Sequence, residues 1–99
     1  MSIQNTLKRT GLPVAYGRFK KKKDLPFIVY IGDGQYDMPA DNTYFFSYNQ
    51  YQIEYYFKEK NEENEKAIEQ ALLEDGFLYV KSSDIYIESE DVWVIYYQV

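Results

Sequence analysis

Aspartate and glutamate are the first candidates for chemistry in this sequence, because it contains neither histidine nor cysteine. The chain therefore lacks the commonest general base, thiolate chemistry, disulfide bonds and cysteine-based zinc sites. Asp33, Asp37 and Asp41 lie close together in the stretch "DGQYDMPAD", and carboxylates in one loop can ligate calcium. The spacing and the closing glutamate of an EF-hand are missing. We therefore favour a simple turn and expect no metal site.

Two other patterns relevant to catalysis are incomplete. The string "GDGQ" at residues 32 to 35 lacks the lysine of a Walker loop and the spacing of a dinucleotide-binding loop. No spacing in the chain pairs a nucleophile with a base. We expect a protein that is not an enzyme, with no catalytic residues and no cofactor.

Charge is divided unevenly along the chain, whose formal net charge is -5. Residues 1 to 23 carry seven Lys and Arg residues and no acid, while the remainder carries all 16 acids against four lysines, which gives +7 and -12. The stretch "YGRFKKKKD" mixes aromatic and basic residues as nucleic-acid binders do, but lysine runs are usually solvated loops. We expect no specific nucleic-acid binding. The asymmetry also suits neighbours that meet head to tail.

Gly, Pro, Asn and Asp residues divide the chain into short segments whose apolar patterns predict helices or strands. The expected elements are, in chain order, a short helix from Ser2 to Gly11, an edge strand or extended arm within 13 to 19, a loop over 20 to 26, a strand over 27 to 31, a loop over 32 to 43, a hairpin or one bulged strand over 44 to 59, a helix over 61 to 76, and strands over 77 to 81, 84 to 88 and 92 to 99.

The segment "NEENEKAIEQALLEDG" is the strongest helix signal. Asn61 is a candidate N-cap, acids crowd the first turn, and Gly76 ends the helix. One stripe of this helix is apolar and the opposite stripe is polar. The apolar stripe holds Ala67, Ile68, Ala71, Leu72 and Leu73, and the polar stripe holds Glu62, Glu65, Lys66, Glu69 and Gln70.

Short turns between the strands predict an α+β fold. We expect a mainly antiparallel sheet of four to five strands, with the main helix packed on one face and a short N-terminal helix. Residues 1–99 form a single domain, in which 1–26 are the N-terminal helix and basic arm and 27–99 are the sheet and main helix.

The closing strand, "DVWVIYYQV", is apolar on both faces: Trp93, Ile95 and Tyr97 alternate with Val94 and Tyr96. One helix covers one face only. The N-terminal helix, the loop over 32 to 43 or a second subunit could cover the other, and we favour a subunit because tyrosine suits surfaces that are buried on association. The residues expected to contact a subunit or another partner are Arg18, Lys20, Lys21, Lys22, Lys23, Tyr56, Trp93 and Tyr97.

The strings "GLPVAYGRF", "PFIVY", "ADNTYFF", "YQIEYYFK" and "DIYIESEDVWVIYY" resemble small structural proteins of tailed phages and prophages of Gram-positive bacteria, of the tail-completion, tail-terminator or head-tail joining type. The resemblance runs over nearly the whole chain. It implies a mixed α/β fold and self-assembly into a ring, commonly a hexamer, that docks onto other tail or connector proteins and through which DNA passes. The implied location is the virion, after assembly in the bacterial host cytoplasm.

A second interpretation comes from the acidic helix and the string "ESED" at residues 88 to 91. Such acidic surfaces can imitate a nucleic-acid backbone, so the alternative is a small acidic module that inhibits a host nucleic-acid-binding protein. The start, "MSIQNTLKRTG", has no signal-peptide pattern and no segment is long enough to span a membrane. We expect a soluble protein with no membrane partner.

Overall fold

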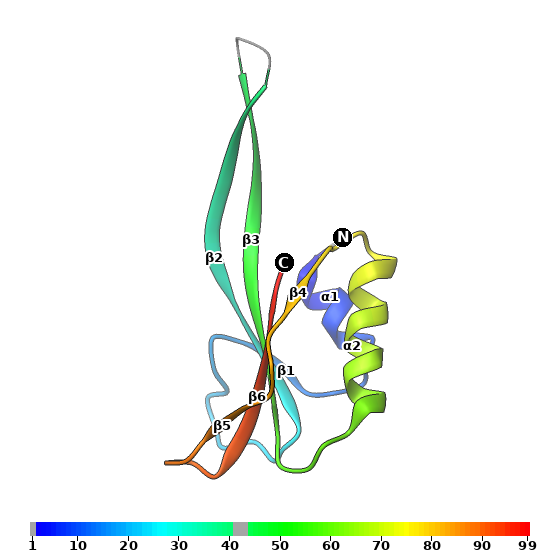
Figure 1. Ribbon diagram of the computed structural model, residues 1–99, viewed down its shortest axis with the longest axis vertical. Helices are drawn as coiled ribbons and strands as arrows, with labels where there is room; N and C mark the ends of the chain where they lie inside the picture. The colour runs from blue at the N-terminus through cyan, green and yellow to red at the C-terminus, as the bar shows by residue number, and fades with distance from the viewer. Residues whose placement is uncertain (1, 41–43) are drawn as a thin grey trace.

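The computed structural model describes residues 2–40 and 44–99, with side chains described outside 35–49 (Figure 1). Within these residues the fold is α+β, with two helices and a six-stranded sheet. The elements are α1 (Ile3–Lys8), β1 (Val14–Tyr16), β2 (Phe27–Ala40), β3 (Tyr44–Phe57), α2 (Glu62–Glu74), β4 (Val80–Lys81), β5 (Ile85–Ile87) and β6 (Val92–Gln98).

The sheet has the order β1-β2-β3-β6-β4, and β5 also pairs with β6. All pairs are antiparallel except β1 with β2, which is parallel. The α+β class and the two helices are therefore confirmed. The expected number of four to five strands was too low, because residues 14–16 form a strand and β4 and β5 pair with opposite ends of β6.

The prediction of a loop over residues 32 to 43 is wrong for residues 32 to 40, because β2 continues to Ala40 beside β3. Gly32 pairs with Tyr51 and Gln35 with Asn49, so two residues of β2 oppose one of β3 at this point. Gly34 has a φ of +86°, which glycine adopts without strain. The turn-forming residues thus make a β-bulge within a long strand. The remainder of that predicted loop, at 41–43, lies outside the described residues.

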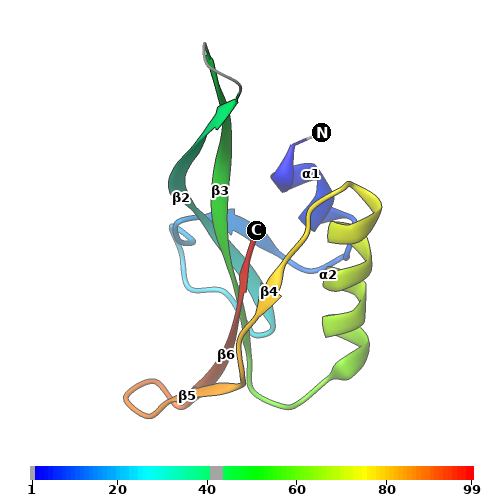
Figure 2. The same cartoon turned by 45° about the horizontal axis from the view of Figure 1, so that its top comes forward.

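Both helices lie on the same side of the sheet (Figures 1 and 2). The Ser2 and Asn61 side chains cap them by accepting hydrogen bonds from the Asn5 and Asn64 amides, at 3.1 and 3.2 Å. The apolar residues beneath the helices form one continuous core. Its buried members are Ile3, Leu7, Ile28, Tyr30, Ile53, Tyr55, Phe57, Ile68, Leu72, Ile95 and Tyr97.

The main helix follows its predicted apolar stripe, with two exceptions. Ile68, Ala71 and Leu72 are buried and Ala67 is half-buried, but Leu73 is 53% exposed. Glu65, expected on the polar stripe, is only 3% exposed. The helix therefore buries a carboxylate against the sheet.

The face of the sheet away from the helices, called the second face below, carries the side chains that alternate with the core. Val29 and Val94 on this face are 5% and 0% exposed, while Tyr56, Tyr96 and Glu54 are half-buried. The segment between β1 and β2 lies on this side of the sheet (Figures 1 and 2). The chain thus covers part of its own second face with the segment between β1 and β2, which is none of the three covers expected from the sequence.

Candidate partner-binding groove

Loop 17–25 connects β1 to β2 and carries the basic residues. Gly17 has a φ of +74°, and its amide donates to the Tyr30 carbonyl at 2.8 Å. The Arg18 amide donates to the Tyr16 carbonyl at 2.8 Å, which closes a tight turn at the end of β1. This left-handed turn directs the following lysines over the second face.

A row of aromatic rings holds loop 17–25 against the sheet. The ring of Phe19 meets the ring of Phe27 edge-on at 5.1 Å between centroids, and Phe27 meets Tyr56 at 5.4 Å. Lys23 places its Nζ atom 6.0 Å from the centre of the Phe19 ring, within range of a cation–π interaction. Phe19 thus attaches the loop to the sheet, and Lys23 packs on Phe19 within the loop.

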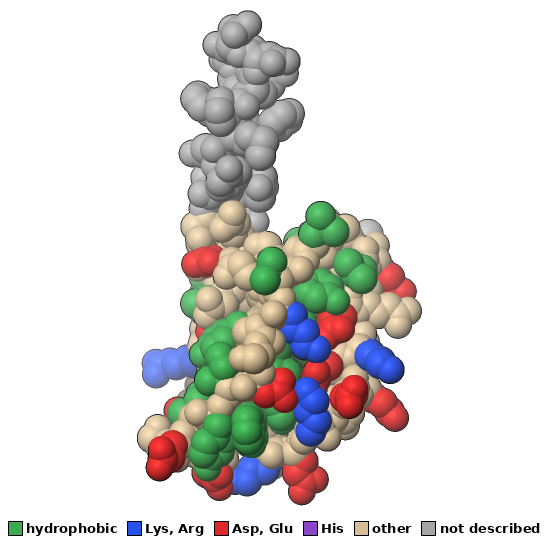
Figure 3. All heavy atoms as spheres, in the orientation of Figure 1, with side chains coloured by type: hydrophobic (Ala, Val, Ile, Leu, Met, Phe, Trp, Pro, Cys, Tyr) green, Lys and Arg blue, Asp and Glu red, His purple; other side chains and the backbone are tan. Residues whose placement is uncertain are grey.

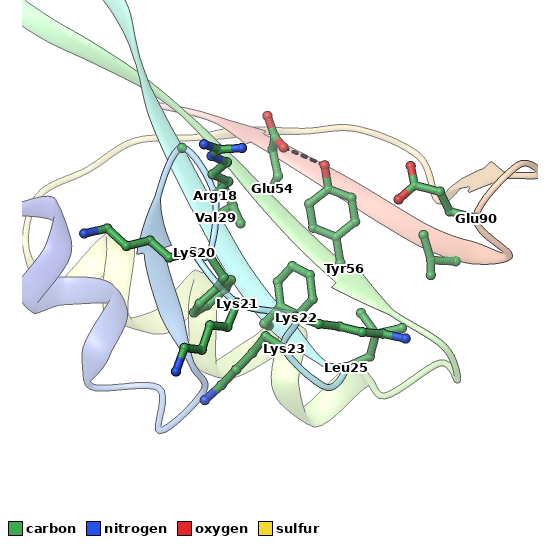
Figure 4. Close-up of a pocket in the computed structure, with 14 residues that line it drawn as sticks. Arg18, Lys20, Lys21, Lys22, Lys23, Leu25, Val29, Glu54, Tyr56 and Glu90 are labelled. Carbon is green, nitrogen blue, oxygen red and sulfur yellow. Dashed lines mark hydrogen bonds between the residues drawn. The ribbon is translucent and has the colours of Figure 1, made fainter.

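A groove of ≈ 470 Å³ lies between loop 17–25 and the second face (Figure 4). Its floor is apolar and aromatic, with Phe27, Val29, Tyr56 and Val92. One side is basic and the other carries Glu54 and Glu90. The basic side holds Arg18, Lys20, Lys21, Lys22 and Lys23.

The polar part of the floor is a short chain of hydrogen bonds. The Tyr56 hydroxyl donates to Glu54 Oε1 at 2.7 Å, and Gln52 Nε2 donates to Glu54 Oε2 at 3.2 Å. Burial and the hydrogen bond to Glu54 raise the pKa of the Tyr56 phenol above its ordinary value. Tyr56 therefore stays a neutral donor that positions Glu54.

The cations of loop 17–25 form no ion pair with any described residue. Arg9, by contrast, lies 2.6 Å from Asp75 and 3.4 Å from Glu74. Lysine ammonium groups in Figure 4 point outward from the loop in several directions. The loop predicted over residues 20 to 26 is confirmed, and the charge of its lysines is available to a partner.

The three predicted aromatic contact residues lie in different places. Tyr56 lines the groove, whereas Trp93 is 38% exposed on the helix side, with its ring centroid 5.1 Å from that of Tyr86. Tyr97 is 0% exposed and its hydroxyl donates to Glu69 at 2.7 Å. Tyr97 is therefore a core residue, which corrects its assignment to the contact surface: its side of β6 is the side that α2 covers.

Sequence reasoning missed an ion-pair cluster between α2 and β4, in which the Glu65 carboxylate is buried and the lysines are partly exposed. Lys81 Nζ lies 2.9 Å from Glu65 Oε1 and 2.8 Å from Glu69 Oε2, and Lys60 Nζ lies 2.7 Å from Glu65 Oε2. Glu65 precedes Ile68 by three residues and Leu72 by seven, so helical spacing already placed it on the apolar stripe. Neither Glu65 nor Glu69 lines the groove, so the cluster is separate from it.

The pKa values in this cluster follow from burial opposed by ion pairing. Burial would raise the pKa of Glu69, but hydrogen bonds from Lys81 and Tyr97 lower it overall. Burial would lower the pKa of Lys81, yet Glu69 and Glu65 raise it overall. Both groups therefore remain charged near neutral pH, so the ion pair between them persists.

No group of three or more residues suited to hold a metal ion occurs among the described side chains. Asp37 and Asp41 of the aspartate pattern are outside that set. Over the same part of the chain, no helix is long and apolar enough to cross a membrane.

No protein-family model, curated protein or solved structure matches this chain.

Proposed function

We propose that this chain is a structural protein of a phage tail or neck, of the tail-terminator or head-tail joining type, which forms a ring and docks onto neighbouring virion proteins. The observation that supports this most is the exposure of Arg18 and Lys20 to Lys23 on the side of the sheet away from acidic α2. Opposite charges on opposite sides of a molecule let one copy attract the next in a head-to-tail arrangement.

The long β2–β3 ribbon also favours assembly (Figure 1). β1 pairs with residues 28–30 of β2, and β6 pairs with residues 52–57 of β3. The backbone hydrogen bonds between Tyr51 and Val99 follow directly after the last of these pairs. Further out, the outer edges of the ribbon have no strand partner among the described residues. A lone two-stranded ribbon is marginal in water and its open edges pair readily with other chains, so a neighbouring subunit would stabilise it.

The ring and its hexameric state come from the resemblance of the sequence to phage joining proteins. In a ring that passes DNA, a lysine-lined channel would bind phosphates and hold the DNA. We therefore place loop 17–25 at a subunit contact or at the rim, rather than in the channel.

Light scattering combined with size-exclusion chromatography tests this proposal on the whole chain. We expect the mass to rise with protein concentration, to fall with added salt because the attraction is electrostatic, and to reach a discrete ring that negative-stain electron microscopy resolves. A monomer at every concentration and at low salt would overturn self-assembly. Assembly into an open filament instead of a ring would overturn the proposal that the chain forms a ring.

The second candidate is the small acidic inhibitor of a nucleic-acid-binding protein. It is favoured by the exposed acids before and within the first turn of α2, namely Glu59, Glu62 and Glu63. It predicts that the monomer binds a purified bacterial nuclease and that DNA competes with it. Failure to protect DNA from nucleases at micromolar protein would remove this candidate.

A further inference from the structure

Three large aliphatic side chains are exposed in the last part of α2 and in the segment that follows it, and they lie close together in the sequence. Leu73 is 53% exposed, Leu78 is 82% exposed and Val80 is 73% exposed. Apolar side chains gather over the C-terminal end of α2 and the segment that follows it (Figure 3). Scattered exposed leucines are common, whereas neighbouring exposed apolar side chains are typical of contact sites.

An exposed acid accompanies these aliphatic residues. The Glu74 side chain is 56% exposed, although it lies 3.4 Å from Arg9. We call Leu73, Glu74, Leu78 and Val80 the α2–β4 patch. It combines apolar area with negative charge, whereas the groove under loop 17–25 combines an apolar floor with positive charge.

The groove and the helix that carries half of this patch lie on opposite sides of the sheet. Groove residues Val29 and Tyr56 alternate along their strands with Ile28 and Tyr55, which pack under the helices. Loop 17–25 and the C-terminal end of α2 lie on different sides in Figures 1 and 2. One chain therefore cannot bring its own α2 end to its own groove, but two copies can join in this way.

We propose that the α2–β4 patch of one copy docks into the groove of a second copy of the same chain. Leu78 is the anchor, because it is the most exposed large apolar side chain among the described residues, and the groove floor offers the rings of Phe27 and Tyr56. Glu74 then faces the lysines of loop 17–25, which form no ion pair among the described residues of their own chain. This contact is heterologous, so repeating it builds a ring or a filament.

This contact rests on the proposed self-assembly, and the α2–β4 patch and the groove are the two surfaces that meet in it. The chain has no cysteine, so single introduced cysteines report on one contact at a time. Leu78→Cys mixed with Lys21→Cys should give a mixed disulfide dimer under mild oxidation. Disulfide formation needs Cα atoms within about 7 Å, so it reports close approach.

The control mixes Lys21→Cys with Glu62→Cys, which lies at the opposite end of α2. The α2 helix spans Glu62–Glu74, so the two ends are separated by roughly 18 Å at about 1.5 Å per residue. We expect the Leu78 pair to cross-link at least tenfold faster than the control pair. Equal rates, in a protein that does self-associate, would overturn this contact and leave the proposed self-assembly in place.

A second variant tests the contact without a cross-link. Leu78→Asp should weaken association by tenfold or more in light scattering, with an unchanged melting temperature because the side chain is exposed. Unchanged association of Leu78→Asp would also overturn the contact. If the wild-type chain itself stays monomeric, the proposed function fails as well, so the two failures are distinct.

Discussion

Lys81 Nζ lies 2.9 Å from Glu65 Oε1, and this ion pair joins the edge strand β4 to the buried side of α2. Glu65 is 3% exposed and Lys81 also contacts Glu69 at 2.8 Å. A carboxylate in this position is tolerated only because two lysines neutralise it. The α2 helix is therefore held to the β4 edge of the sheet by ion pairs as well as by apolar packing.

Replacing Lys81 with methionine should therefore destabilise the fold. Glu65 would remain buried with Lys60 as its only cation among the described residues, and we expect the lost charged hydrogen bond to lower the free energy of unfolding by about 2 kcal/mol. Urea denaturation measures this value. Lys66→Met, at an exposed position of α2, is the matched control and should change stability by less than about 0.5 kcal/mol. Equal effects of the two variants would contradict the role of the cluster.

Stability should fall in acid because of Glu69. Its folded-state pKa lies below its ordinary value of 4.5, since bonds from Lys81 and Tyr97 outweigh the effect of burial. A carboxylate of this kind stabilises the fold fully above its unfolded pKa, and that stability is lost as pH falls through the folded pKa. We expect a flat profile from pH 7 to about pH 5 and a decline below, measured by urea midpoints. Glu69→Gln should flatten this decline, and an unchanged slope would contradict the assignment.

Removing the charge of loop 17–25 should weaken assembly and leave the fold intact. Lys20→Ser combined with Lys21→Ser removes two exposed cations that have no ion partner among the described residues. We expect at least a several-fold loss of association in light scattering and a melting temperature within about 2 °C of the wild type.

The matched control for the lysine variant is Lys8→Ser combined with Lys66→Ser, which changes the net charge by the same amount at exposed positions outside the loop. If both double variants weaken association equally, net charge alone governs it and the loop has no special part. A large drop in melting temperature would instead make the lysines part of the folded structure.

Trp93 distinguishes the proposed contact from another surface. Its ring stacks on Phe57 at 6.5 Å and lies 5.1 Å from Tyr86, but the residue is 38% exposed. Trp93→Ala should cost about 2 kcal/mol in unfolding free energy, less than a fully buried tryptophan, with association unchanged. Chemical denaturation and light scattering give the two values. Lost association with retained stability would move the subunit contact to the face that carries Trp93.

Sequence patterns correctly predicted those elements in which the local signals, such as caps and turn residues, agree with the pattern of buried side chains. The main helix begins at Asn61 as expected because its cap, its acidic first turn and its apolar stripe all favour the same start. The β2 extension was missed because Gly32, Gly34 and Pro39 are typical of loops, while pairing with β3 is a tertiary effect that outweighs their preference.

The groove could be predicted only in part. A run of lysines predicts an exposed loop, and Lys20 to Lys23 are indeed exposed. Its place above Val29 and Tyr56 depends on the parallel pairing of β1 with β2, which no local pattern specifies. Tyr97 was misplaced for a similar reason, because alternation identifies two faces of a strand without saying which one a helix will cover.

The exposure of four consecutive lysines has one more consequence, for proteolysis. Trypsin cleaves after lysine and needs an accessible chain, so loop 17–25 is a natural cutting site. The pieces on either side remain attached through β1 on β2 and through Ile3 and Leu7 in the core. A nicked yet folded molecule is therefore the expected digestion product, and a subunit seated over the loop would protect it from the protease.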